Sequence, residues 1–276
     1  MINLPFHNYL INLSEDCEIV YDMSQDRIGD AIGSLPILQH ICVLNPKLKL
    51  SVIYCAKDNG EYSWHRGINL FDWSDWKPHT IYNYFPSGKV IFNSVDGSGF
   101  SIWGTLHRLN LQPKLRSPSN ISHTERNVSM HIINAVGIRN KPYVSRRTLS
   151  MEKYEQIGKY LVQCGITVTR LGAEYDRIRD FDSCINDLTS QNLTLHDTFT
   201  QLAKSDLFMG GDSGLTHAAA ALGIPVIAEV DPVSKSAKGL AGIPQNLLTE
   251  IPYNCNFETH LQLLQNHPLL KDRITI

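Results

Sequence analysis

The stretch DLFMGGDSGLTHAAAALGIPVIAEV, residues 206–230, decides the fold of this chain. Its first five residues are largely apolar and predict a strand over 206–210, and Pro225–Val230 predicts another strand. Between them, residues 213–222 have the composition of a helix, and Gly223 is placed to end it. A strand, a helix and a strand in succession predict two parallel strands joined by a crossover helix.

A second unit of this kind lies near the N-terminus. The sequence predicts a strand over Cys17–Ser24, a helix over Asp30–Cys42 and a strand over Leu48–Cys55. Pro36 falls inside the predicted helix and is expected to kink it. Two separate strand–helix–strand units favour an α/β fold built on doubly wound parallel sheets.

The remaining segments suggest two halves of similar size. Asn127–Ile138 predicts a helix, and Arg139–Pro142 interrupts two apolar segments, which is typical of a linker. We therefore expect domains over residues 1–140 and 141–276. Further elements are expected over Lys89–Val95 (strand), Ser150–Cys164 (helix with Ser150 as N-cap), Ile166–Leu171 (strand), Leu195–Lys204 (helix) and Asn256–Leu270 (helix).

Composition excludes several classes of protein. The 276 residues carry 25 Lys and Arg against 27 Asp and Glu, and this net charge of -2 argues against a nucleic-acid binder. The six cysteines form no C-x-x-C pair, so they indicate reduced thiols rather than a zinc site or a disulfide framework. The sequence shows neither a basic secretion leader nor a run of about 18 apolar residues, so we expect a cytoplasmic protein without a transmembrane segment.

The junction between the strand at 206–210 and its helix is the best candidate for a ligand site. In open parallel sheets, ligands bind at the carboxyl ends of strands, and a helix N-terminus suits a phosphate. Gly211 and Gly214 allow close approach to the backbone, while Ser213, Thr216 and His217 offer polar groups. The same spacing also fits a helix whose Asp212 and Ser213 serve only to cap the backbone.

The corresponding junction in the first half carries Asp30, in the run DRIGDAIGSLPILQH from residue 26 to 40. A carboxylate at the carboxyl end of a strand could act as a general base. The alternative is that Asp30 is an N-cap or a first-turn acid that the helix dipole favours. Single histidines elsewhere, His131 among them, are expected to be surface or satisfied core residues.

Three ordered segments together resemble glycosyltransferase family 9, the heptosyltransferase-like glycosyltransferases. GDSGLTHAAAALGIPVIAEV resembles the C-terminal motif of the family, in which Asp-Ser/Thr-Gly-x-x-His opens a helix and Ala-Leu-Gly-x-Pro follows. RIGDAIGSLPILQHICVLNPKLKLSVI is similar to its N-terminal motif, and SRRTLSMEKYEQIGKYLVQCGITVTRLGAEYD to the segment that opens its second domain.

The resemblance implies a GT-B fold, with two Rossmann-like domains facing across a cleft. It also implies an inverting, metal-independent transferase that uses a nucleotide-diphosphate sugar, typically ADP-heptose, without a cofactor. The acceptor would be a glycan, a lipid-linked saccharide or a protein, as in lipopolysaccharide or glycan biosynthesis. By the resemblance, Asp30 matches the general base, and the donor is held by Arg147, Asp176, Asp212, Ser213, Gly214, Leu215, Thr216 and His217.

One departure from the family pattern supports a rival interpretation. The family often has Gly-Pro-Thr after the strand that follows the helix, whereas residues 229–233 read EVDPV here. Asp231 would place negative charge near a phosphate, as expected of a catalytically idle module that binds a nucleotide sugar or a protein partner. Asp180 and Asp182 imitate a metal-binding D-x-D, but a predicted helix there would point them apart, so we expect no metal site.

Overall fold

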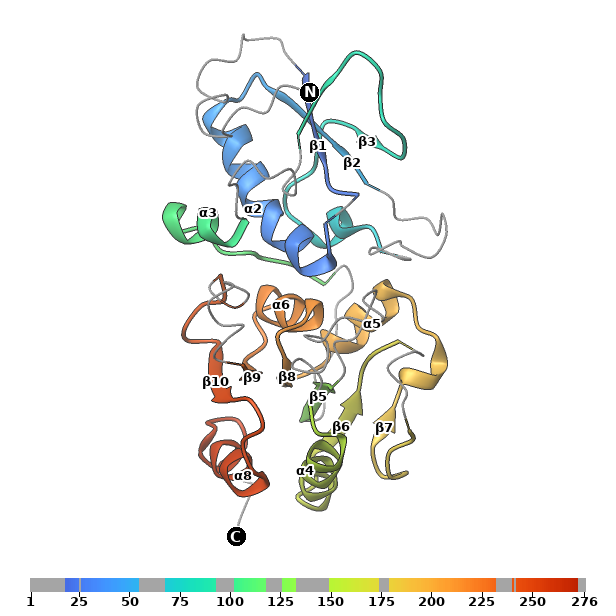
Figure 1. Ribbon diagram of the computed structural model, residues 1–276, viewed down its shortest axis with the longest axis vertical. Helices are drawn as coiled ribbons and strands as arrows, with labels where there is room; N and C mark the ends of the chain where they lie inside the picture. Colours follow the sequence, from blue (N-terminus) through green and yellow to red (C-terminus); the bar gives the residue numbers. More distant parts are fainter. Residues whose placement is uncertain are drawn as a thin grey trace.

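The computed structural model of the protein contains two parallel β-sheets, one in each half of the elongated molecule (Figure 1). The first sheet has the strand order β3-β2-β1-β4, and the second has the order β10-β9-β8-β5-β6-β7. The structure describes residues 18–24, 26–54, 68–92, 102–117, 126–132, 149–173, 179–231, 240 and 242–272.

The first domain confirms the predicted N-terminal strand–helix–strand unit. Its helix starts at Ile28, two residues before the predicted start, and continues past Pro36 to Leu44. β1 pairs in parallel with both β2 and β4, and β2 pairs in parallel with β3. The elements are β1 (Glu18–Asp22), α2 (Ile28–Leu44), β2 (Lys49–Ile53), η1 (Leu70–Trp73), β3 (Ile81–Tyr82), β4 (Val90–Phe92) and α3 (Ile102–Leu109).

The second domain confirms most of the predicted helices and strands after residue 149, but residues 180–182 do not form the predicted helix, and its last helix is shorter than expected. Every strand pair in its sheet is parallel. The elements are β5 (Asn127–His131), α4 (Met151–Gln163), β6 (Thr167–Arg170), β7 (Asn186–Asp187), η4 (Thr189–Gln191), α5 (Leu195–Leu202), β8 (Leu207–Gly211), α6 (Gly214–Ala221), β9 (Val226–Val230), β10 (Leu248–Pro252) and α8 (Phe257–Asn266).

Another prediction is wrong in this region. The segment 127–131, expected to be helical, forms β5 in the middle of the second sheet. Val128 and Met130 both pack into the core beneath α4, which is the alternating pattern of a strand. The predicted boundary between residues 140 and 141 therefore falls after the first strand of the second sheet.

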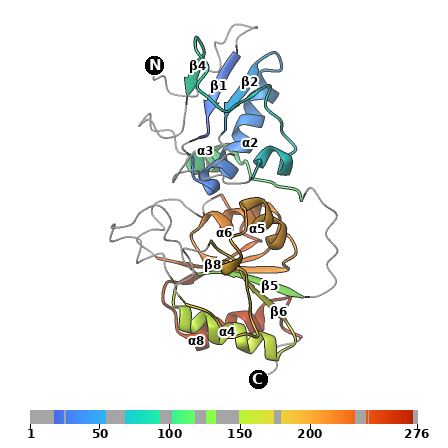
Figure 2. The same cartoon turned by 90° about the vertical axis from the view of Figure 1, so that its right-hand side faces the viewer.

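Helices cover both faces of the second sheet. α5 and α6 lie between this sheet and the first domain, whereas α4 and α8 cover the opposite face (Figures 1 and 2). The alanines that follow His217 in α6 are buried, and α6 packs directly against α2 of the first domain. One apolar core accordingly continues from the first domain into the second.

Trp73 is a central part of the contact between the domains. Its buried ring lies edge-on to His196 and Phe199 of α5, with ring centroids 5.6 Å apart in both pairs. The chain leaving α3 passes along this contact, because Leu115 N–H donates to the Ala221 carbonyl at 2.7 Å and Arg116 N–H to the Trp73 carbonyl at 2.8 Å. The domains therefore meet through side-chain packing and main-chain hydrogen bonds.

The strand order of the second sheet contains a topological switch point. From β5 the chain adds β6 and β7 on one side, and it then returns to build β8, β9 and β10 on the other. Ligands in open parallel sheets bind at the carboxyl ends of the strands beside such a point. β5 and β8 thus mark the expected ligand position.

Among the described residues, no helix is both long enough and apolar enough to cross a membrane.

Candidate functional site

The junction of β8 and α6 has the geometry of a capped helix start. Ser213 is the N-cap, with an extended backbone, and its Oγ accepts a hydrogen bond from Thr216 N–H at 3.3 Å. The first N–H groups of any helix have no acceptor within the helix. Because the cap serves Thr216, the N–H groups of Gly214 and Leu215 are the ones that remain for an external anion.

The hydroxyls of Ser213 and Thr216 are engaged within the protein. Their oxygens lie 3.0 Å apart, and the Thr216 hydroxyl also bonds to the Gly211 carbonyl. Both side chains are buried. The interpretation of Ser213 as a cap is therefore confirmed, and the Thr216 hydroxyl is bound to the loop that precedes α6.

His217 lies one residue further along α6 and faces the first domain. Its Nε2 is 3.6 Å from Oδ1 of Asp212, and its side chain is 6% exposed. A Cβ built on Gly29 would lie 2.9 Å from Cδ2 of His217, closer than real Cβ atoms come. The imidazole therefore rests against the backbone of α2.

The start of α2 meets the start of α6 at a pair of glycines. A Cβ built on Gly214 would lie 2.2 Å from Cγ2 of Ile28 and 3.6 Å from the Gly29 nitrogen. A side chain at Gly214 would clash with Ile28 of α2, whereas one at Gly29 would meet the His217 ring. The carboxyl end of β1, which precedes α2, thus faces the carboxyl end of β8, as the expected arrangement of two domains requires.

Asp30 occupies the first turn of α2 at this meeting point and is half-buried. The N-cap of α2 is Arg27, so the N-cap interpretation of Asp30 is wrong, while its interpretation as a first-turn acid is confirmed. An acid in a first turn is favoured by the partial positive charge of the helix end. Asp30 therefore lies in the first turn of α2, directly after Gly29, and is not the cap of that helix.

Three further residues singled out by the sequence remain to be placed. Arg147 and Asp176, the predicted phosphate and ribose contacts, lie outside the described residues. Asp231 follows the last residue of β9 and is half-buried. β9 is the neighbour of β8 in the sheet, so Asp231 lies at the same edge of the sheet as the α6 start.

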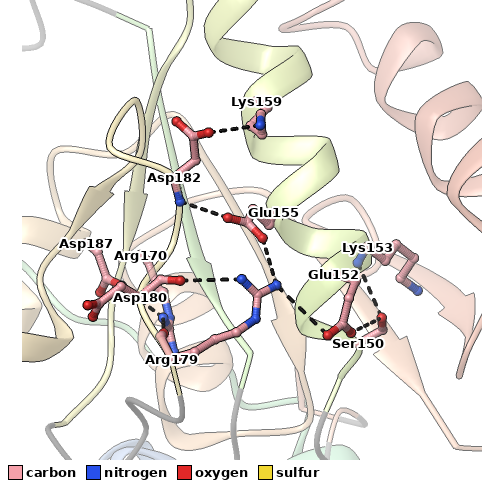
Figure 3. Close-up of polar contacts among 10 residues, drawn as sticks. All are labelled: Ser150, Glu152, Lys153, Glu155, Lys159, Arg170, Arg179, Asp180, Asp182 and Asp187. Carbon is pink, nitrogen blue, oxygen red and sulfur yellow. Dashed lines mark hydrogen bonds and ion pairs between the residues drawn. The ribbon is translucent and has the colours of Figure 1, made fainter.

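The D-x-D segment is not a helix, contrary to prediction. Residues 179–185 are irregular and bind to α4 through polar contacts (Figure 3). Asp182 Oδ2 lies 2.8 Å from Lys159 Nζ, and its N–H donates to Glu155 Oε1 at 2.8 Å. Arg179 pairs with Glu155 Oε2 at 2.7 Å. These contacts give Asp182 a role in holding this segment on α4.

A buried polar cluster lies between β9, α4 and α8, on the face of the second sheet away from α6. Within the described part of the chain, Glu229, Cys255 and His260 bring potential metal-ligand atoms within 4.8 Å of one another. The ammonium of Lys153 already lies 2.5 Å from Glu229 Oε1. Burial of the Glu229 carboxyl raises its pKa. Hydrogen bonds and charges from His260 and Lys153 lower the pKa by more than burial raises it, so the pKa of Glu229 lies below its usual value. Lys153 thus serves as the cation of this cluster.

His131 is a site residue that sequence reasoning missed. It ends β5, beside Gly210 of β8, and its Nδ1 lies 3.3 Å from the Ser213 hydroxyl. Ser213 is 82 positions further along the chain. The pairing of β5 with β8 brings the two together, whereas the sequence predicts a helix for the segment that contains His131.

The family comparison agrees with the resemblance given by the motifs. Residues 147–230 match the model of glycosyltransferase family 9 (heptosyltransferase). This match confirms the resemblance for the part of the chain that contains β8, α6 and β9, and it supports glycosyltransferase activity. No curated protein matches the chain in sequence.

Solved structures confirm the GT-B-like fold. The glycosyl transferase family 9 protein from Veillonella parvula DSM 2008 is 12% identical, with 95% of this chain and 92% of that chain covered and a TM-score of 0.60. TibC, an iron-containing dodecameric glycosyltransferase from enterotoxigenic E. coli H10407, is 13% identical over 89% and 65%, with a TM-score of 0.56. E. coli ADP-heptose lps heptosyltransferase II is 11% identical over 87% and 92%, with a TM-score of 0.53.

We predict that Gly29→Ala weakens nucleotide binding without weakening the fold. The added methyl group forces the His217 imidazole to move, since it would lie 2.9 Å from Cδ2. Alanine favours a helix over glycine by about 1 kcal/mol, so α2 itself is not destabilised. The affinity for ADP, the nucleotide that the resemblance implies, should fall roughly threefold to tenfold in calorimetry. The midpoint of thermal unfolding should not fall.

The double variant Gly29→Ala/His217→Ala is the control. It removes the ring that the methyl group would meet, so it should bind ADP as well as His217→Ala alone. A further loss of affinity in the double variant would show that Gly29 acts on something other than His217.

Proposed function

We propose that this protein is an inverting glycosyltransferase that transfers a heptose from ADP-heptose to a glycan or lipid-linked saccharide acceptor. The family match over residues 147–230 supports the heptosyltransferase class. TibC has been solved in complex with ADP-D-beta-D-heptose, and the E. coli relative is named an ADP-heptose heptosyltransferase, which supports this donor. The protein would act in the cytoplasm, where nucleotide sugars are the donors, and without a nucleic-acid partner.

The observation that carries the proposal is the meeting of two helix starts at the switch point. α2 and α6 approach through Gly29 and Gly214, and each helix presents its N-terminus to the junction. A helix N-terminus carries a partial positive charge of roughly half an elementary charge. Two such ends side by side repel one another, and an anion bound beside both would relieve that repulsion.

The leaving group in this proposal is the nucleoside diphosphate. Its phosphate oxygens accept hydrogen bonds from the N–H groups of Gly214 and Leu215, which the Ser213 cap leaves available. These N–H groups are fixed before the reaction, so they stabilise the negative charge that develops as the bond between sugar and phosphate breaks. His217 would assist from the same turn, where it lies within 3.6 Å of Asp212.

The base in this proposal is Asp30. As the acceptor hydroxyl attacks the anomeric carbon, its proton passes to the Asp30 carboxylate, and the diphosphate leaves from the opposite side with the bonding electrons. The new bond thus forms on the face opposite the old one, which inverts the configuration. Asp30 belongs to the same first turn of α2 as Ile28 and Gly29, which meet Gly214 of α6.

We further propose that transfer needs no metal. In the acidic pair that resembles a metal motif, the Asp182 carboxylate pairs with Lys159 and the Asp182 N–H donates to the Glu155 carboxylate. Both partners belong to α4, the helix on the side of the sheet away from the junction. The two helix starts offer an alternative source of positive charge for the diphosphate. TibC is iron-containing, so this part of the proposal concerns the present chain alone.

A second candidate function is a catalytically idle module that binds a nucleotide sugar or a protein partner. Asp231 favours it, because this half-buried carboxylate lies at the same sheet edge as the α6 start. A carboxylate there would oppose a diphosphate. The half-buried Asp30, which α2 does not use as its cap, favours the enzyme.

A donor panel tests the two candidates. The protein is incubated with ADP-heptose and with UDP-, GDP- and ADP-linked hexoses, together with lipid-linked saccharide acceptors, and released nucleoside diphosphate is measured. We expect release from an ADP-linked sugar, and the same rate in excess EDTA. Binding of nucleotide sugars without release would support the idle module. A rate lost in EDTA and restored by Mn²⁺ would contradict the metal-independent mechanism.

We predict that Asp30→Asn lowers turnover by roughly 100-fold or more. Asparagine keeps the shape of the side chain but cannot accept the proton. Because Asp30 does not contact the donor in this mechanism, the affinity for ADP should stay within about twofold of the original value. Steady-state kinetics and calorimetry give the two quantities.

Asp72→Asn is the matched control, since Asp72 is an exposed acid in the first turn of η1 in the same domain. It removes the exposed first-turn carboxylate of another helix and should leave turnover unchanged. Full activity of a folded Asp30→Asn variant would remove Asp30 from the reaction.

A further inference from the structure

His131 and Ser213 meet across the switch point of the second sheet. His131 is the last residue of β5, and Ser213 follows β8, the neighbouring strand. Both side chains are buried, with 7% and 5% of their surface exposed, and His131 Nδ1 lies 3.3 Å from Ser213 Oγ. This contact joins the two strands whose carboxyl ends flank the proposed diphosphate.

The direction of each hydrogen bond in this group can be worked out from its members. The Gly211 carbonyl can only accept, so the Thr216 hydroxyl donates its single proton to it. The Ser213 hydroxyl, 3.0 Å from Thr216 Oγ1, must then be the donor of that contact. Ser213 has no second proton, so the hydrogen bond with His131 must have Nδ1 as its donor.

Both lone pairs of the Ser213 hydroxyl oxygen therefore accept hydrogen bonds. One lone pair accepts Thr216 N–H, which is the N-cap bond of α6, and the other accepts His131 Nδ1–H. The cap is thereby fixed in one orientation by a residue from another strand. A side chain that only filled space in the core would not require a donor at this position.

We infer that His131 is a positioning residue for the donor site, and that it acts as a fixed Nδ1–H donor to Ser213. The inference rests on the proposed function. His131 orients the Ser213 hydroxyl so that its oxygen accepts the Thr216 N–H. The N–H groups of Gly214 and Leu215 then remain available to bind the diphosphate. His131 touches neither the substrate nor the reacting atoms.

Two variants of His131 separate a donor from a space-filling side chain. His131→Asn places an amide N–H near the position of Nδ1, whereas His131→Leu fills the space with no donor. We expect the affinity for ADP to fall roughly tenfold in His131→Leu and to stay within about twofold of the original in His131→Asn. Because the effect is on donor binding, the KM for the nucleotide sugar should rise while kcat changes little.

A double variant tests whether His131 acts through Ser213. Ser213→Ala should weaken ADP binding by itself, and adding His131→Leu to it should cause no further loss. Additive losses would overturn the inference. So would equal ADP affinity in His131→Leu and the original protein, or a loss in His131→Asn as large as in His131→Leu.

Nitrogen-15 NMR of the labelled histidines provides a readout independent of any ligand. The signal that disappears in His131→Asn should show a proton on Nδ1. A neutral ring protonated only on Nε2 would overturn the inference, even in a protein that binds ADP. If the original protein binds no ADP, the proposed donor site fails, while this spectrum still decides the role of His131 as a donor.

Discussion

The contact between the starts of α2 and α6 is the constraint on which the rest of the structure depends. Gly214 brings the two helix ends together at a distance that a side chain there would not allow, and Gly29 leaves room for the His217 ring against α2. Each end carries part of a positive charge, and the junction also holds Asp30 on one side and Asp212 on the other. Acidic groups and helix ends thus balance one another in the space where an anionic ligand is proposed to bind.

The packing around the junction serves to hold this contact. α6 is short and rich in alanine, so its buried face lies close to both the sheet below and α2 above. Trp73 fixes the neighbouring side of the interface against α5, and the main chain at Leu115 and Arg116 bonds to both domains. Three contacts around the proposed site therefore fix the position of one domain relative to the other.

Local sequence patterns could predict the two strand–helix units because their signals are contained within about 20 residues. The apolar strand before Gly210, the capped helix and the glycine at 223, which has a φ of 81°, follow directly from residue types. The helix predicted over Asn127–Ile138 is wrong for residues 127–131, which form a strand. Its alternation of buried Val128 and Met130 with polar neighbours is the period of a strand.

The site could be predicted only in part, for a physical reason. Asp30 and the α6 start could be found because each lies at a local strand–helix junction. The role of His131 depends on the pairing of β5 with β8, and the contact of Gly29 with His217 depends on the packing of two domains. Contacts between residues so far apart in the chain leave no periodic signal.

A crystal structure of the protein with ADP tests the central claim most directly. The account predicts that the β-phosphate accepts hydrogen bonds from the N–H groups of Gly214 and Leu215, at about 2.7–3.2 Å, beside the start of α2. ADP bound elsewhere, with the α6 start still covered by Ile28 and Gly29 and no phosphate near it, would contradict the account.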